Sequence, residues 1–205
     1  MEEQAGAVIE PPVVNIVGEL VALGPLRRDL LPLYQRWIND FAALRTLGAL
    51  PPGPTTLEAE EAWYDEQAAA GVVAFTIYER GAAAWRPIGN TGLRGVDHRH
   101  GTAEFAILIG EPGARGRGYG TETARLMLDY AFTGLGLRNV MLTCAEYNLA
   151  GRRAYEKAGF QEFGRRRRCR WLAGRWWDDI SMDALAEEFV SPVLARVLAP
   201  DEPRS

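Results

Sequence analysis

The chain has 205 residues, a formal net charge of −4, 47% apolar residues and 24% charged residues. This length accommodates one well-buried core, and the composition is ordinary for a soluble globular domain. The net negative charge argues against a general nucleic-acid coat protein, and no uninterrupted apolar run reaches the length that spans a membrane.

The amino terminus and the cysteines favour an intracellular protein without a metal. The amino terminus, Met1 to Gln4, is acidic where a signal peptide is basic, so we expect a cytoplasmic location. Cys144 and Cys169 fit neither a metal-ligand spacing nor a disulfide framework. We therefore expect no bound metal.

The first part of the chain predicts a strand and two helices. Residues 1–14 contain two prolines and no periodicity, so we expect a flexible lead-in. A strand is expected over residues 18–26, and apolar residues recur with helical spacing from 29 to 43. After the breaker at residues 51–54, Thr55 or Thr56 can cap a second helix that ends near residue 70.

The pattern then changes to that of strands. Residues 72–78, 87–96 and 103–109 predict three strands, which most easily form an antiparallel meander. A glycine-rich turn, a helix, a strand over 140–144 and a helix over 150–157 follow. This order predicts an α/β arrangement with one parallel crossover.

The last part of the chain predicts a closing hairpin. Residues 160–163 and 171–185 form its strands, with a turn near Gly174. We expect one domain over residues 15–185, followed by a C-terminal extension over 186–205 that includes a possible final helix.

The turn from Arg115 to Gly120, Arg-Gly-Arg-Gly-Tyr-Gly, is the most informative segment. Its alternate glycines let the backbone bend and let a ligand approach closely. The helix behind it supplies unpaired N–H groups and a positive dipole end, which favour a phosphate. The alternative is an ordinary turn with solvated arginines.

Two phosphate-binding templates do not fit this turn. A P-loop needs a lysine before its Ser or Thr, whereas Gly120 leads directly into Thr121. A dinucleotide-binding fold needs a different glycine spacing near the start of its βαβ unit.

The pattern that fits is Arg/Gln-x-x-Gly-x-Gly/Ala, with which the chain resembles the GNAT superfamily of N-acetyltransferases. A second block, from Glu146 to Phe160, is similar to the Asn-x-x-(Ala/Ser)-x-x-x-Tyr-x-Lys-x-Gly-Phe segment of one branch. That branch includes the ribosomal-protein N-terminal acetyltransferases and several small-amine and antibiotic acetyltransferases. The resemblance covers roughly residues 18–185. It implies a mixed, mostly antiparallel sheet of about seven strands, splayed at a cleft and flanked by about four helices.

The resemblance implies acetyl-CoA as the cosubstrate and an amine as the acceptor. The turn amides would hold the pyrophosphate, and pantetheine would enter between the splayed strands. Asn148 would bind the pantetheine arm, although it can equally cap the following helix. The residues implied in binding are Leu108, Ile109, Gly110, Arg115, Gly116, Arg117, Gly118, Tyr119, Gly120, Thr121, Asn148, Arg152 and Arg153.

Two residues are implied in catalysis. Tyr155 matches a tyrosine that would protonate the departing thiolate, and the alternative is a core aromatic on an amphipathic helix. Glu104 matches an acidic position whose carboxylate would deprotonate the incoming ammonium, and the alternative is electrostatic binding of the amine. Acyl transfer would be direct, without a covalent acyl-enzyme.

Other functions stay open at this level. The acceptor can be a protein N-terminus or a small amine such as a polyamine, aminoglycoside or amino acid. A non-catalytic acyl-CoA-binding module is the main alternative, and the basic run at residues 165–170 leaves RNA binding as a third class. We expect no membrane partner, and a homodimer is compatible with the resemblance.

Overall fold

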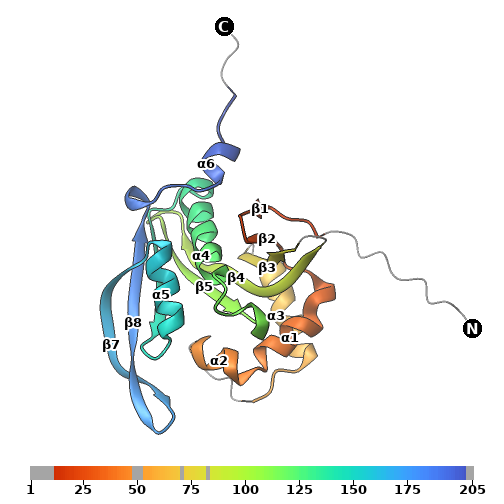
Figure 1. Ribbon diagram of the computed structural model, residues 1–205, viewed down its shortest axis with the longest axis vertical. Coiled ribbons are helices and arrows are strands. Elements are labelled where there is room, and N and C mark those ends of the chain that lie inside the picture. The colour runs from red at the N-terminus through yellow and green to blue at the C-terminus, as the bar shows by residue number, and fades with distance from the viewer. Residues whose placement is uncertain (1–11, 48–52, 70–71, 82–83, 202–205) are drawn as a thin grey trace, which may run out of the picture.

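The computed structural model describes residues 12–47, 53–69, 72–81 and 84–201 (Figure 1). Most of the predicted lead-in, residues 1–14, lies outside these ranges, as does part of the breaker at 51–54. None of the described helices is long and apolar enough to cross a membrane.

One mixed sheet of eight strands organises the described residues, in the order β1-β2-β3-β4-β5-β6-β8-β7. All neighbouring pairs are antiparallel except β5 and β6, which are parallel. The strands are β1 (Ile16–Val17), β2 (Val21–Pro25), β3 (Val73–Arg80), β4 (Trp85–Asp97), β5 (Thr102–Ile109), β6 (Asn139–Ala145), β7 (Gln161–Leu172) and β8 (Arg175–Leu185).

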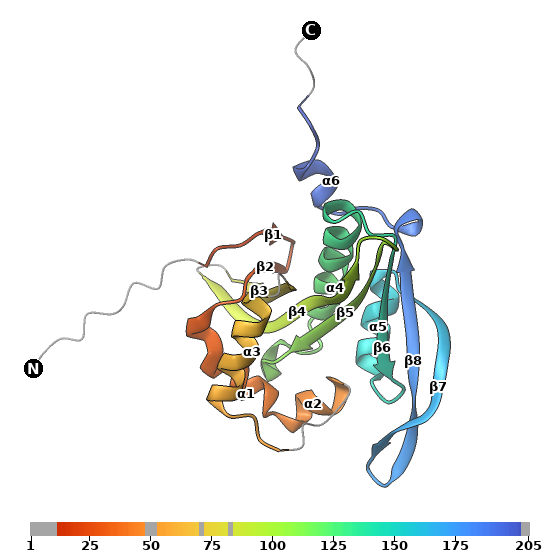
Figure 2. The ribbon, with the colours of Figure 1, turned by 180° about the vertical axis from the view of Figure 1, so that it is seen from behind.

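The helices form two groups around the sheet. In Figures 1 and 2, α1 and α3 lie beside the first strands and α2 continues from α1 to contact β5 and β6, whereas α4 and α5 pack next to each other against the sheet. The helices are α1 (Leu31–Ile38), α2 (Phe41–Leu47), α3 (Leu57–Ala69), α4 (Tyr119–Asp129), α5 (Leu149–Ala158) and α6 (Leu194–Val197).

The main core lies between the sheet and α4. Leu126, Met127 and Leu128 are fully buried on this helix, and they pack in one cluster with residues of the central strands such as Leu142 and Ile180. Because these three residues are consecutive, they point to different sides of the helix, and α4 is therefore buried on several sides. This packing fixes the start of α4 relative to the end of β5.

The fold class predicted from the sequence is confirmed, with local differences. The strand expected over residues 160–163 continues to Leu172 as β7, so the second strand of the hairpin begins at Arg175 instead of residue 171. The first strand is preceded by a short partner, β1, because the chain turns back at Gly18 to Leu20. The helix expected over 29–43 is divided into α1 and α2 at Asn39 and Asp40. The segment expected to be a final helix contains only a 3₁₀ turn and the four-residue α6.

Asp129 ties this C-terminal segment to the domain. Its fully buried carboxylate accepts hydrogen bonds from the backbone N–H groups of Val193 (3.0 Å) and Leu194 (2.8 Å). Because two backbone donors satisfy the buried oxygen, the carboxylate is compatible with its apolar surroundings. Val193 and Leu194 are therefore packed against the domain.

Candidate functional site

The two parallel strands at the centre of the sheet pair over only three residues. Thr102 to Glu104 of β5 lie in register with Asn139 to Met141 of β6, and the strands then diverge (Figure 2). Beyond this point, Phe105 to Ile109 remain paired with β4 alone. Among the described residues, β6 thus provides no backbone partner for β5 beyond Glu104, and an extended ligand can pair with this strand edge as an added strand.

The predicted glycine-rich turn connects the end of β5 to the start of α4. Gly116 and Gly118 have φ values of 75° and 87°, a left-handed conformation that favours glycine. Gly118 is the N-cap of α4 and provides no side-chain cap. The first N–H groups of this helix and its positive dipole end are therefore suited to an anion.

An acidic side chain in the first turn of α4 does not compete for these N–H groups. The carboxylate of Glu122 instead accepts hydrogen bonds from the backbone N–H groups of Glu19, Leu20 and Val21, at 2.7–2.8 Å. The helix start keeps its capacity for an anion, and the β1–β2 turn is fixed against it.

Arg115 holds the end of β5 rather than extending into solvent. Its Nε donates to the carbonyl of Ile109 (3.1 Å), and its Nη2 donates to the carbonyl of Gly110 (2.7 Å) and to Asp40 (2.7 Å). The neighbouring Gly110 is required, because an added Cβ would lie 2.1 Å from the indole of Trp37. The side chain of Arg115 thus positions the strand end and the linker between α1 and α2.

Arg117 is the more exposed arginine of the turn. Its guanidinium binds Glu79 (2.9 Å) and lies over the ring of Tyr119, 5.1 Å from the centroid. Glu79 also accepts a hydrogen bond from the Tyr119 hydroxyl, and this bond together with Arg86 lowers the pKa of Glu79. The arginine is therefore held beside the turn, with part of its charge open to solvent.

The start of α5 contains the next residues that the sequence predicts to bind the cosubstrate. Asn148 is the N-cap, and its Oδ1 accepts a hydrogen bond from the N–H of Gly151 (3.0 Å), so the amide Nδ2 is left to donate. Arg152 pairs with Glu162 (2.9 Å), whereas Arg153 is exposed and its Nε donates to the carbonyl of Leu149 (3.2 Å). The capping role of Asn148 is confirmed by this geometry.

Tyr155 lies at the point where β5 and β6 part. Its ring makes edge contacts with Phe105, the first residue of β5 beyond the parallel pairing, and with Phe160. Burial, and to a lesser extent the Cys144 thiol, raise the pKa of Tyr155 above its ordinary value. The phenol therefore remains protonated at neutral pH and retains a proton to donate.

Glu104 occupies the neighbouring position of β5 but faces the other way. Phe105 is buried, whereas Glu104 is exposed and lies in register with Arg94 of β4 and Met141 of β6. Because successive side chains of a strand point to opposite faces, Glu104 and Tyr155 lie on opposite faces of the sheet. A group held between the strands would thus have the carboxylate on one side and the phenol on the other.

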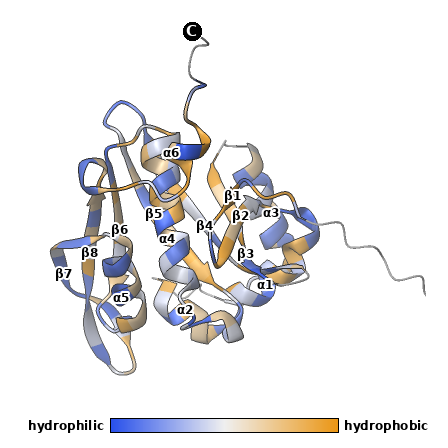
Figure 3. Ribbon diagram, turned by 45° about the horizontal axis from the view of Figure 1, so that its top comes forward, coloured by the Kyte–Doolittle hydropathy of each residue, from blue (hydrophilic) through white to orange (hydrophobic). Residues whose placement is uncertain are grey.

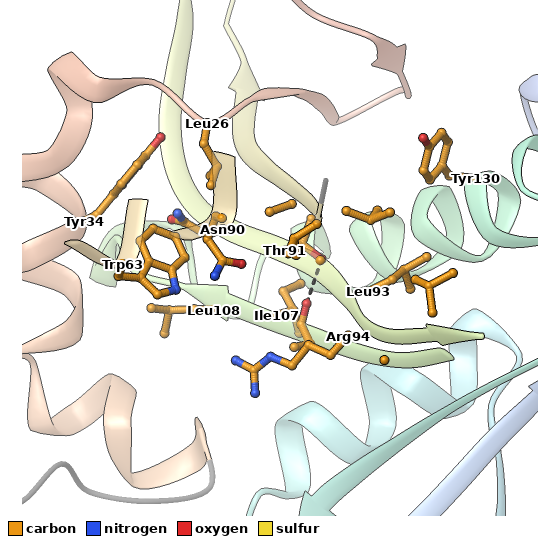
Figure 4. Close-up of a pocket in the computed structure, with 18 of the residues that line it drawn as sticks. Leu26, Tyr34, Trp63, Asn90, Thr91, Leu93, Arg94, Ile107, Leu108 and Tyr130 are labelled. Atoms are coloured by element: carbon orange, nitrogen blue, oxygen red, sulfur yellow. Dashed lines mark hydrogen bonds between the residues drawn. The ribbon is translucent and has the colours of Figure 1, made fainter. Parts of the chain in front are cut away.

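A cavity of about 820 Å³ adjoins this strand on the side of α1 and α3 (Figure 4). Its wall includes the backbone segment Ala106 to Leu108 of β5, Asn90 and Arg94 of β4, and Tyr34 of α1. One face of α3 adds Glu60, Trp63 and Gln67. A small acceptor fits in this volume next to β5.

The sequence patterns did not identify these α3 residues. Their spacing of three and four positions places them on one helix face, which is the available signal. Glu60 shares this face with Trp63 and is buried, whereas the neighbouring Glu58 and Glu61 are exposed.

The basic run on β7 does not form one surface. Arg168 has a positive φ of 49°, and the β7–β8 register shifts between Arg166 and Arg170, so the alternation of faces is interrupted. Arg165 binds Glu162 (2.7 Å), and Arg170 binds Asp179. Figure 3 shows β7 as a largely hydrophilic strand, which agrees with a solvated edge.

The comparison with protein families agrees with this geometry. The model of the acetyltransferase (GNAT) domain matches residues 21–161, a range that includes the parting strands, the glycine-rich turn and α5. The chain belongs to the GNAT family.

Individual relatives differ in their acceptors. The spermidine N(1)-acetyltransferase of Escherichia coli (strain K12) is 30% identical over 96 residues, which cover 47% of this chain and 51% of that protein. The human alpha/beta-tubulin-N-acetyltransferase 9 is 27% identical over 163 residues. The match covers 72% of this chain and 75% of that protein. The matched segments span about half the length of the first curated relatives (46%, 52% and 51%).

A solved structure shares the fold. The spermidine N-acetyltransferase from Vibrio cholerae, in complex with CoA and spermine, superposes with a TM-score of 0.73 at 24% identity. The match covers 83% of this chain and 98% of that one.

Among the described residues, no cluster of His, Cys, Asp and Glu side chains has the composition of a metal site.

Proposed function

We propose that this GNAT chain is an acetyl-CoA-dependent N-acetyltransferase that transfers the acetyl group to a primary amine by direct attack. The observation that carries the proposal is the divergence of β5 from β6 beside the uncapped start of α4. An open strand edge suits the amide-bearing pantetheine arm, and the helix start suits the pyrophosphate. The resemblance in the segment from Asn148 to Phe160 supports membership of the branch that contains the ribosomal-protein N-terminal acetyltransferases.

The site residues fit this substrate. An added Cβ at Gly116 meets nothing within 4 Å, so the turn is open to a bound phosphate. Gly118 to Thr121 offer backbone donors, with Arg117 beside them and Arg115 behind them as a positioning residue. Leu108 to Gly110 and the Asn148 amide would bind the pantetheine arm, and Arg152 and Arg153 would lie toward the CoA phosphates.

The proposed reaction joins the amine nitrogen to the acetyl carbon and breaks the carbon–sulfur bond. Glu104 removes a proton from the ammonium, directly or through water, and the free amine attacks the thioester carbonyl. A backbone N–H on the open side of β5 stabilises the developing oxyanion. Tyr155 then gives its proton to the departing thiolate, which leaves as CoA thiol, and the second proton lost by the attacking nitrogen restores the Tyr155 phenol, directly or through water.

A panel of amines, with release of the CoA thiol as the readout, tests this function. The panel contains aliphatic diamines, an aminoglycoside, amino acids and peptides with free N-termini. Thiol release that depends on one class of amine, with equimolar acetylated product identified by mass spectrometry, is the expected result. Acetyl-CoA binding without thiol release from any amine would instead support the non-catalytic acyl-CoA-binding module.

A further inference from the structure

Glu60 is a buried acidic side chain on a wall of the cavity. Only 7% of its surface is exposed, and its side chain makes no hydrogen bond or ion pair within the described part of the chain. Burial raises the pKa of its carboxyl group above the ordinary value, with no neighbouring charge to offset it. A buried carboxyl group without a partner is destabilising, so its presence in an internal position requires an explanation.

A second polar group lines the same cavity without a partner. The Oδ1 atom of Asn90, on β4, is buried and accepts no hydrogen bond from the described residues. Because side-chain amide orientation follows from the hydrogen bonds available, either end of this amide can face a ligand. Two unsatisfied polar groups, from α3 and from the sheet, therefore border one volume.

The third contributor is aromatic. Trp63 follows Glu60 by three residues on the cavity face of α3, and Figure 4 shows its indole and the Asn90 side chain on the cavity wall. A carboxylate, an amide oxygen and an indole face each attract a cation. Their combination favours an ammonium group over a neutral or anionic one.

Two cationic side chains, those of Arg94 and His98, also line the cavity. Arg94 is four residues beyond Asn90 on β4, so the two Cα atoms are about 13 Å apart along an extended strand. His98 lies further along the chain. Neither forms an ion pair with Glu60.

We propose that Glu60, with Trp63 and Asn90, forms a subsite for a second, non-reacting ammonium group of the acceptor. This inference rests on the proposed function, because the cavity borders Ala106 to Leu108 of β5, next to which the thioester would lie. The acceptor class is then a linear diamine or polyamine: one nitrogen reacts beside β5 and the other is bound at Glu60. The subsite is a specificity determinant and takes no part in the proton transfers.

Two probes that differ by one charge test the subsite in the unaltered protein. Diaminobutane and n-butylamine have the same carbon chain, and only the diamine carries a second ammonium. We expect kcat/KM for the diamine to exceed that for the monoamine by about tenfold or more, the effect of one hydrogen bond to a charged group. Calorimetric titration of the CoA-saturated protein measures the binding of each probe separately from turnover.

Substitution then assigns the effect to Glu60. Glu60→Gln retains the shape and removes the charge, and we expect it to abolish most of the preference for the diamine while the monoamine value stays within about twofold. Glu61→Gln is the matched control, because Glu61 is exposed on the same helix. If Glu60→Gln fails to fold, the comparison of the two probes with the unaltered protein still decides whether a second charge is recognised.

The outcomes separate the two proposals. Turnover without a preference for the diamine, or a preference that Glu60→Gln leaves intact, overturns the subsite and leaves the transferase assignment standing. Diamine binding that Glu60→Gln abolishes, in a protein without turnover, supports the subsite and contradicts the proposed activity. If the diamine neither binds nor reacts, the subsite is overturned.

Discussion

Glu122, in the first turn of α4, accepts a 2.8 Å hydrogen bond from the backbone N–H of Leu20, a residue 102 positions earlier in the chain. The same carboxylate accepts two further N–H bonds, from Glu19 and Val21. One side chain thus fixes the β1–β2 turn to the start of the helix that follows the glycine-rich turn. The start of α4 is positioned by the first strands of the sheet as well as by its own packing.

Replacement of Glu122 by Gln is expected to lower the free energy of unfolding by about 1–3 kcal/mol, because the amide NH₂ faces N–H donors and leaves at least one unsatisfied. Urea denaturation measures this loss. Glu187→Gln removes the same charge from an exposed position without a side-chain hydrogen bond among the described residues, and it should change stability little. Equal effects of the two substitutions would show that the loss comes from net charge rather than from the carboxylate contacts.

Gly116→Ala and Gly174→Ala form a matched pair. Their φ values are 75° and 79°, and an added Cβ meets nothing within 4 Å at either position. Each should cost about 1–2 kcal/mol of stability, the penalty for a left-handed alanine. Only Gly116→Ala should weaken acetyl-CoA binding, because Gly174 lies in the β7–β8 turn. Unchanged affinity in Gly116→Ala would mean that no phosphate approaches this backbone.

Asp40→Asn tests the positioning role of Arg115. The substitution removes the 2.7 Å ion pair but leaves the bonds from Arg115 to the carbonyls of Ile109 and Gly110. Because both members of the pair are about one-third exposed, a loss of stability within about 1 kcal/mol is expected. Arg115→Ala removes all three interactions, so it should cost more stability and also weaken acetyl-CoA binding. Equal losses of stability would indicate that the carbonyl bonds contribute nothing.

Tyr155→Phe should lower kcat by about 100-fold, since the thiolate would leave without its proton donor. Because burial raises the pKa of the phenol, the activity of the unaltered protein should show no loss from ionisation of Tyr155 up to pH 9. Acetyl-CoA affinity and the circular dichroism spectrum serve as controls for folding. Unchanged turnover would assign Tyr155 to the aromatic core with Phe105 and Phe160.

Alkaline pH should destabilise the fold through Cys144. Burial raises its thiol pKa from 9.0 to about 11, so between these values the unfolded chain releases a proton that the folded chain retains. The free energy of unfolding therefore stays constant below pH 9 and falls as the pH rises toward 11, by on the order of 1–3 kcal/mol. In Cys144→Ala, urea denaturation should give a smaller decrease over this window. An identical decrease would assign the pH dependence to other groups.

The order of helices and strands could be predicted from the sequence because short-range sequence signals agree with the tertiary structure. Three such signals each depend on only a few neighbouring residues. They are the apolar spacing on α4, the C-cap Gly159 that follows α5, and the glycine-rich turn. The division of α1 from α2 was missed although Asp40 carries a local signal, since its carboxylate caps α2 by accepting from the N–H of Ala42 (2.9 Å). The same side chain is bonded to Arg115, 75 residues away, which no local pattern shows. The amphipathic spacing continues across that boundary, so the sequence alone indicates one helix.

The candidate site was predictable where backbone chemistry determines it and less so where side chains meet across the fold. Gly116 and Gly118 have the positive φ values that a ligand-approaching turn requires. The role of Arg115 differs from that of a solvated phosphate ligand, since its partners are backbone carbonyls of β5. Glu60 and Asn90 are far apart in the sequence, and only the tertiary fold, in which α3 packs against α1, places both on the wall of one cavity.

The central claim is that the parted strands and the start of α4 hold acetyl-CoA. Isothermal titration calorimetry of the full chain with CoA and with acetyl-CoA measures this directly. The account predicts one-to-one binding of both ligands, with weaker binding in Gly116→Ala and unchanged binding in Gly174→Ala. The absence of binding of either ligand to folded protein would contradict it.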